Sequence, residues 1–409
     1  MTSSSPSIPA PKSKSRITAL DMSRVFAALF VIIEHATTDQ HGKPFPEFDA
    51  LEKALPLIGR VISNAARSEF FFVTSLFLLA VSVERFMGSY GEQATKQAKR
   101  LLLPFLVWTG VYLVFRSYKA DGFGYGPGLW GEAWIWEIAW YEIWQVISSP
   151  IETVKVLVLG TSKYHMHFLP MLFVLTLFYP IYKVAEDRPW LGLMIIPLLL
   201  MKNQFDVFIY SNFWVNGDKT WWFGKEYWSL ETLRFVRSML IFGVKALTYT
   251  GYGIAMFAIY GIVQKDVKML RPFLPVLSLI LGLFALAFVA HGMLFFVKGA
   301  WVNPTGLIYL PYYTIGLVIV LTLLAVSYWP WPPIFSRLAP YSFGTYLVHP
   351  IVIDVFDVWT KGWGWSVPAY SSAKMIVAVA FTVLIVAILS KLPFWAWSMG
   401  LKRKKLFEL

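Results

Sequence analysis

The stretch RPFLPVLSLILGLFALAFVAHGMLFFV, residues 271–297, has one arginine and one histidine as its only ionisable groups. A helix needs about 20 mostly apolar residues to cross a bilayer, so this stretch predicts a membrane span. Comparable apolar runs recur along almost the whole chain of 409 residues, of which 57% are hydrophobic and only 15% charged. The sequence therefore predicts an integral membrane protein built as an all-α polytopic transmembrane bundle.

About ten spanning helices are expected in a single transmembrane domain, residues 16–400, with no separate soluble domain. The Ser/Pro-rich basic residues 1–15 are predicted to be a disordered tail, and residues 401–409 a short basic tail. The range 189–203 is short and contains Pro197, and without it the two termini would lie on opposite sides. The predicted spans are 18–37, 66–86, 100–118, 166–184, 189–203, 236–263, 271–297, 304–328, 341–359 and 374–398.

The net charge of +12 has a distribution typical of a membrane protein. Basic residues cluster at helix ends on alternate loops, and cytoplasmic loops carry an excess of Lys and Arg, so both termini are predicted to be cytoplasmic, in the plasma (inner) membrane. This topology accounts for the charge without a nucleic-acid partner. The absence of cysteine excludes disulfides, thiolate nucleophiles and cysteine-ligated metals. The clusters are Lys12, Lys14 and Arg16; Lys96, Lys99 and Arg100; Lys265, Lys268 and Arg271; and residues 402–405.

Residues 129–144, LWGEAWIWEIAWYEIW, predict an interfacial helix on the outer side, because tryptophan prefers the depth of the lipid headgroups. Two roles remain open for it: an aromatic belt, or a platform on which sugars stack.

Arg24 and His35 place ionisable groups inside the first predicted span. Eleven residues make almost three helical turns, so both side chains project from one face about 16 Å apart. Ionisable groups in a bilayer normally face the bundle interior or a wet cavity, which predicts a polar tunnel along this face. The alternative is a structural ion pair between Arg24 and Asp21, with His35 a satisfied core histidine.

Three further stretches put polar groups near that tunnel. Glu69 opens the second span near the expected depth of His35 and is a candidate to orient the imidazole, with Glu34 as its rival. His165 and His167 are two residues apart and point in different directions on a helix, so a metal site is not expected. Ser75 is a further hydroxyl inside the second span, and Ser342, Tyr346 and His349 follow i, i+4, i+7 spacing and form one polar stripe.

These stretches, in this order, make the chain similar to the membrane-bound acyltransferase 3 family, whose members O-acylate cell-surface polysaccharides. The resemblance extends from about residue 18 to 360. Leu76 stands where that family usually has glycine, and His167 where it usually has tryptophan. The residues that carry the resemblance are Asp21, Arg24 and His35; Glu69, Phe71, Phe72 and Ser75; Lys99, Arg100 and Pro104; His165 to Leu169; and Ser342, Tyr346 and His349.

The resemblance implies a cytoplasmic acyl-CoA donor, a polysaccharide or other glycan hydroxyl as acceptor, no metal, and a site open to both faces of the membrane. The acyl group is expected to be acetyl, with succinyl next. A polysaccharide synthase or export machinery is an expected partner besides the lipid bilayer. Because CoA is polyanionic, its predicted site combines basic residues with two hydroxyls: Arg24, Ser75, Lys96, Lys99, Arg100, Ser342 and Arg337.

The predicted catalytic group is His35, oriented by Glu69 or Glu34, as the base that deprotonates the acceptor hydroxyl. Tyr346, His349 or His165 is expected to donate to the oxyanion. An acyl-histidine or acyl-serine intermediate remains open. The alternative from another class is a secondary transporter or polysaccharide-export subunit that uses the same buried residues as a relay, although the chain shows no internal repeat.

Overall fold

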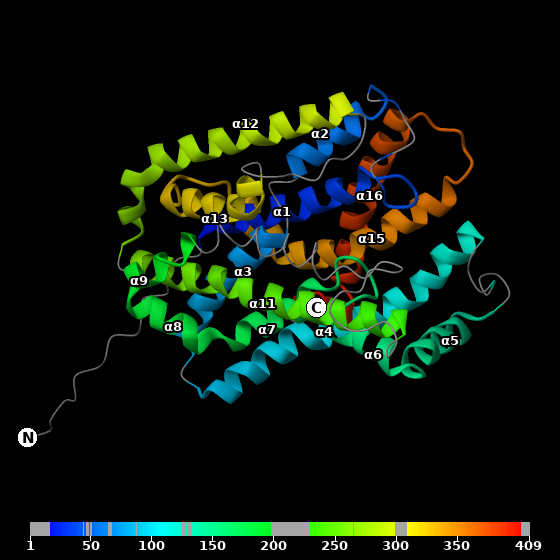
Figure 1. Ribbon diagram of the computed structural model, residues 1–409, viewed down its shortest axis with the longest axis horizontal. Coiled ribbons are helices and arrows are strands. Elements are labelled where there is room, and N and C mark those ends of the chain that lie inside the picture. Colours follow the sequence, from blue (N-terminus) through cyan, green and yellow to red (C-terminus); the bar gives the residue numbers. More distant parts are fainter. Residues whose placement is uncertain are drawn as a thin grey trace, which may run out of the picture.

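The computed structural model describes residues 17–401 except 44, 46–48, 50, 64–67, 87, 125–127, 129–132, 198–228, 265 and 299–308. Both predicted tails lie outside this part, apart from Leu401. Within it all regular elements are helices, as predicted (Figure 1). They are α1 Thr18–Ala36, α2 Ala54–Ser63, α3 Ser68–Glu84, α4 Tyr90–Phe123, α5 Ile135–Ile147, α6 Pro150–Leu157, α7 Phe168–Leu177, α8 Tyr179–Asp187, α9 Pro189–Leu193, α11 Leu230–Val263, the 3₁₀ helix η2 Val267–Phe273, α12 Leu274–Lys298, α13 Tyr309–Ala325, α14 Ile334–Leu338, the 3₁₀ helix η4 Ala339–Tyr341, α15 Ser342–Trp359, α16 Val367–Leu389 and α17 Pro393–Ser398.

Four helical stretches of the described chain are long and apolar enough to cross a membrane. They are Tyr90–Phe123, Glu231–Val263, Val267–Leu294 and Val367–Leu389. The consecutive helices α7 and α8 together form a fifth candidate, bent by 58°. Membrane character and the all-α class are therefore confirmed, whereas ten spans and two cytoplasmic termini stay predictions.

Two of the predicted spans are interrupted, and proline explains both breaks. The range 166–184 is divided at Phe178 into α7 and α8, and Pro180 lies in the first turn of α8, where its missing N–H removes a bond to the preceding turn. The range 374–398 ends at Leu389 and resumes at Pro393, because the residue before a proline disfavours helical geometry. Of the predicted span 189–203, the structure shows α9, and residues 198–203 lie outside the described part.

Helix α1 lies in the interior of the bundle and positions the residues of the site. It packs against α2, α3, α13, α15 and α16 (Figure 1). Ala27, Ala28 and Ala36 are buried on it, and such small side chains let neighbouring helices approach closely. Arg24 and His35, both half-buried, therefore face other helices at least in part.

Helix α5 covers part of the predicted interfacial segment, of which residues 129–132 lie outside the described part. Trp136, Trp140 and Trp144 are exposed, which is the pattern expected at a membrane interface. On the opposite face Glu142 is buried and accepts hydrogen bonds from Arg116 and Ser117 of α4. This ion pair fixes α5 to the last turns of α4.

Gly316 allows α13 to approach α3 closely, and we expect Gly316→Ala to destabilise the protein. An added Cβ would lie 2.7 Å from the Cα of Phe70, which is backbone and cannot rotate away. Overpacking of this kind costs about 1–3 kcal/mol. The thermal unfolding temperature in detergent measures the effect. The matched control is Gly282→Ala on α12, where nothing lies within 4 Å of the added Cβ; an equal loss in both variants would contradict the close approach at Gly316.

Candidate active site

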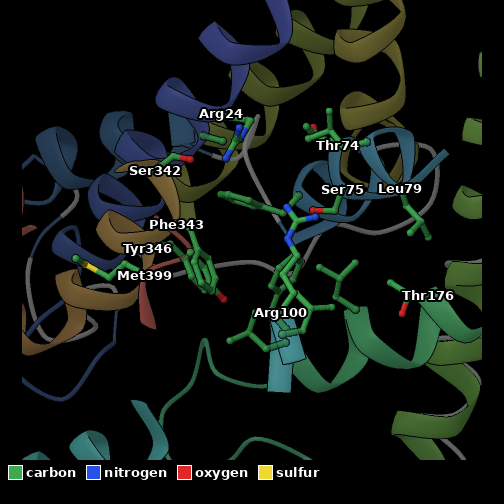
Figure 2. A pocket seen from close by; sticks show the side chains of 18 of the residues that line it. Arg24, Thr74, Ser75, Leu79, Arg100, Thr176, Ser342, Phe343, Tyr346 and Met399 are labelled. Atoms are coloured by element: carbon green, nitrogen blue, oxygen red, sulfur yellow. The ribbon is translucent and has the colours of Figure 1, made fainter. Parts of the chain in front are cut away.

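A cavity of about 630 Å³ opens between α1, α3, α4, α7 and α15. Several predicted site residues line it: Arg24 from α1, Ser75 from α3, Arg100 from α4, and Ser342 and Tyr346 from α15 (Figure 2). These residues are separated by up to several hundred positions in sequence, so only the tertiary fold brings them to one cavity.

Two guanidinium groups give this cavity positive charge. Figure 2 shows Arg100 reaching from α4 into the cavity, with Arg24 and Ser342 on another wall. Arg24 Nη1 lies 3.8 Å from the Asp21 carboxylate, so the ion pair that the sequence offered as an alternative is present. Arg24 also lines the cavity. Asp21 also accepts a hydrogen bond of 3.0 Å from Ser336.

The other predicted basic residues lie elsewhere. Lys96 and Lys99 line a separate shallow depression at the start of α4, together with Ser89 and Glu92. Arg337 is exposed on α14 and does not line the main cavity. The structure thus groups Arg24, Ser75, Arg100 and Ser342 and leaves these three residues apart. Gln97 of α4 also lines the cavity, one turn before Leu101 of the same helix, and was not among the predicted site residues.

Three histidines from separate segments meet beyond the cavity. The ring centroid of His349 lies 5.6 Å from that of His35 and 5.5 Å from that of His165. The His35 and His349 rings are stacked, at 17° between their planes. The ring of Tyr164 also contacts the His35 ring, with 4.2 Å between their centroids. The predicted histidines of α1, α15 and the segment before α7 therefore form one cluster.

The ring nitrogens of this cluster have spare capacity for hydrogen bonds. His349 Nδ1 donates to the Thr345 carbonyl at 3.3 Å. His349 Nε2 and both ring nitrogens of His165 are buried and have no hydrogen-bond partner in the described part of the chain. Buried polar atoms in proteins are nearly always hydrogen-bonded, so these nitrogens are free to bond to a group from outside the described part of the chain.

Tyr346 connects the cavity with the histidines. Its ring lines the cavity and lies 5.0 Å from the His165 ring and 6.1 Å from the His349 ring, measured between centroids. Its hydroxyl donates to the His165 carbonyl at 2.5 Å. Tyr346 consequently forms the wall between the two parts of the site.

The two candidate carboxylates take different places. Glu69 is buried and accepts a hydrogen bond of 3.3 Å from the Tyr249 hydroxyl. Glu34 is half-buried, and its backbone carbonyl accepts from Thr37. In the described residues, the side-chain contacts of His35 are with rings, Tyr164 and His349. That Glu69 or Glu34 orients His35 stays a prediction.

Sequence reasoning missed a charged network beside the histidines. Asp354 and Asp357 of α15 pair with lysines of other segments: Lys119, Lys163 and Lys374. Acidic and basic residues inside predicted spans are a functional signal, and Asp354, Asp357 and Lys374 lie in the predicted spans 341–359 and 374–398. These three residues could therefore have been selected from the sequence, but the predicted site of this helix ended at His349.

No group of three or more potential ligands is arranged to hold a metal ion in the described residues. His167 lies apart from the cluster: it is exposed, and its Nδ1 donates to the Tyr164 carbonyl at 2.7 Å.

A comparison with protein families gives the site its context. The acyltransferase 3 family model, described as an acyltransferase domain, matches residues 17–391. The chain belongs to this family. No curated protein and no solved structure matches the chain. The predicted resemblance is confirmed, and the acyltransferase match includes the three histidines, both cavity arginines and the charged network of α15. Membership implies transferase activity for a membrane protein of this kind.

Proposed function

We propose that this acyltransferase moves a short acyl group from cytoplasmic acyl-CoA to a hydroxyl of an extracytoplasmic polysaccharide. Acetyl is the first expected group and succinyl the second. One observation carries the proposal: Tyr346 borders both a cavity with two arginines and a cluster of three histidines. The first suits a polyanionic donor and the second suits proton transfer.

The residues that line the cavity support the proposed donor. Arg24 and Arg100 would bind CoA phosphates, and charge-assisted hydrogen bonds to phosphate are among the strongest in proteins. The hydroxyls of Ser75 and Ser342 would take the amides of the pantetheine arm. Phe71, Phe168 and Tyr346, which also line the cavity, would surround the acyl thioester.

The reaction can be written on the residues of the cluster. His35 removes the proton of the acceptor hydroxyl as its oxygen attacks the thioester carbonyl. A carbon–oxygen bond forms, the carbon–sulfur bond breaks, and the proton passes to the departing CoA thiolate. His165, whose ring nitrogens are unpartnered, is the favoured oxyanion donor, because the Tyr346 hydroxyl is already engaged with a carbonyl. Glu69 or Glu34 would still act as the group that orients His35.

The proposal places the protein in the plasma (inner) membrane as a multi-pass enzyme, with the donor site toward the cytoplasm and the histidines toward the outer face. A polysaccharide synthase or export complex would supply the acceptor.

Purified protein in detergent, acetyl-CoA or succinyl-CoA, and the producer's exopolysaccharide test this function. Because the chain has no cysteine, a thiol reagent reports only CoA that is released. We expect thiol release that depends on the glycan, together with a matching mass increase of its repeat unit. Transfer without a sealed compartment would also distinguish an enzyme from a transporter. If neither donor is consumed and CoA does not raise the unfolding temperature, the proposed function is wrong.

A further inference from the structure

The charged network of α15 reaches every segment that carries a histidine of the cluster. We propose that Asp354 and Asp357, with Lys119, Lys163 and Lys374, are positioning residues that hold His35, His165 and His349 in one arrangement. This inference rests on the proposed function.

Lys374 links the network to the end of α1. It is fully buried, and its Nζ lies 2.7 Å from Asp357 Oδ1. The same Nζ donates to the backbone carbonyls of Thr38 at 3.1 Å and Asp39 at 3.3 Å. Thr38 in turn donates its hydroxyl to the His35 carbonyl at 2.8 Å. Lys374 therefore fixes the backbone directly after His35.

Lys163 links the network to the segment that carries His165. It forms an ion pair with Asp354, and its Nζ lies 5.4 Å from the centroid of the Tyr164 ring that contacts His35. Only Tyr164 lies between Lys163 and His165 in the sequence, so this ion pair limits the movement of both rings.

Lys119 of α4 joins the two carboxylates. Its Nζ lies 2.9 Å from Asp354 Oδ1 and 3.5 Å from Asp357 Oδ2. Tyr370 adds a hydroxyl donor to Asp357 at 2.5 Å. Both aspartates are buried and lie on the helix of His349, so α15 is the element to which the other segments are tied.

Energetics favours a positioning role over a purely stabilising one. Asp354, Asp357 and Lys374 are buried, and taking such charges out of water carries a large penalty. Replacing a buried charged network with apolar side chains is often neutral or stabilising. Stability alone therefore does not account for these buried charges, whereas a role in holding the histidines in place does. Moving a reacting group by about 1 Å from the productive arrangement can lower the rate about 10²-fold.

The test uses Lys163→Cys, the single thiol in a chain without native cysteine. Lys163 is suitable because its side chain is 16% exposed, whereas Lys374 is inaccessible. Alkylation with 2-bromoethylamine displaces bromide and restores an ammonium group of nearly lysine length, and iodoacetamide adds a neutral group of similar size. Both products come from the same purified protein, so a folding defect affects them equally.

We expect Lys163→Cys to lower kcat at least tenfold with the KM for acyl-CoA within twofold of wild type, because the donor cavity lies elsewhere. Aminoethylation should restore at least half of kcat, and carbamidomethylation should restore none. Full activity of Lys163→Cys, or equal recovery with both reagents, would overturn the proposal. If the cysteine variant does not fold, Asp354→Asn replaces it, with the same expected loss of kcat.

Amide hydrogen exchange of residues 159–167 gives a second readout that needs no substrate. Exchange should accelerate in Lys163→Cys and slow again after aminoethylation alone. Should the wild-type protein transfer no acyl group, this exchange result still decides the positioning role. Unchanged exchange in all forms would overturn it independently of the proposed function.

Discussion

His35→Ala is expected to lower acyl transfer by about 10²- to 10⁴-fold, the range that a general base contributes. The histidine lies in ring contact with His349 and Tyr164, and neither neighbour is placed to take over its position on α1. The alanine variant removes the imidazole without introducing a new group. The measurement is the rate of glycan-dependent thiol release, at protein levels matched by immunoblot.

The control is His41→Ala. This histidine is exposed and follows α1 by five residues. Its ring contacts that of Phe123, with 5.7 Å between centroids and 48° between planes, outside the cluster. It should retain wild-type transfer and a normal unfolding temperature. If His35→Ala transfers at the wild-type rate, another group is the base, and His349, whose ring stacks on that of His35, is the first candidate. If both variants lose activity, the loss reflects a general sensitivity of this end of the protein.

The relation between Arg24 and His35 was predictable because helical period is a local property. Eleven residues bring two side chains back to one face whatever the rest of the chain does. In the structure Arg24 lines the cavity, and His35 joins the cluster on the other side of Tyr346. The same local reasoning predicted that Ser342, Tyr346 and His349 share a stripe.

The sequence could not show which of the basic residues at the start of α4 enters the cavity. Lys96 lies about one turn before the adjacent residues Lys99 and Arg100, and each successive residue turns by about 100°, so tertiary packing decides which one enters the cavity. It is Arg100. The charged network was harder still, because the ion pairs of Lys119 and Lys163 with the aspartates join positions 191 to 238 residues apart. Such distances leave no trace in local periodicity.

Removing Arg100 is expected to weaken CoA binding by about 10- to 100-fold, since a hydrogen bond to a charged group contributes about 1.5–3 kcal/mol. Arg100 is a cleaner test than Arg24. Arg24 also pairs with Asp21, so its loss disturbs a structural contact, whereas Arg100 has no ion-pair partner in the described part of the chain. CoA stabilises the folded state in proportion to the logarithm of its concentration over Kd, so the CoA-dependent rise in unfolding temperature should shrink.

Lys391→Ala is the matched control for this prediction. Lys391 is exposed just after α16, close in sequence to the segment that lines the cavity, and it is not part of the lining. Removing it takes one positive charge from the surface without touching the proposed site, and a long-range effect of charge is screened at physiological salt beyond about 8 Å. Equal loss of CoA stabilisation in both variants would mean that net charge, and not the guanidinium in the cavity, attracts the donor. Arg100→Lys sharpens the result, because an ammonium keeps the charge but cannot form the two parallel bonds that a guanidinium makes to phosphate. A partial recovery in Arg100→Lys would therefore show that Arg100 recognises the phosphate by shape as well as by charge.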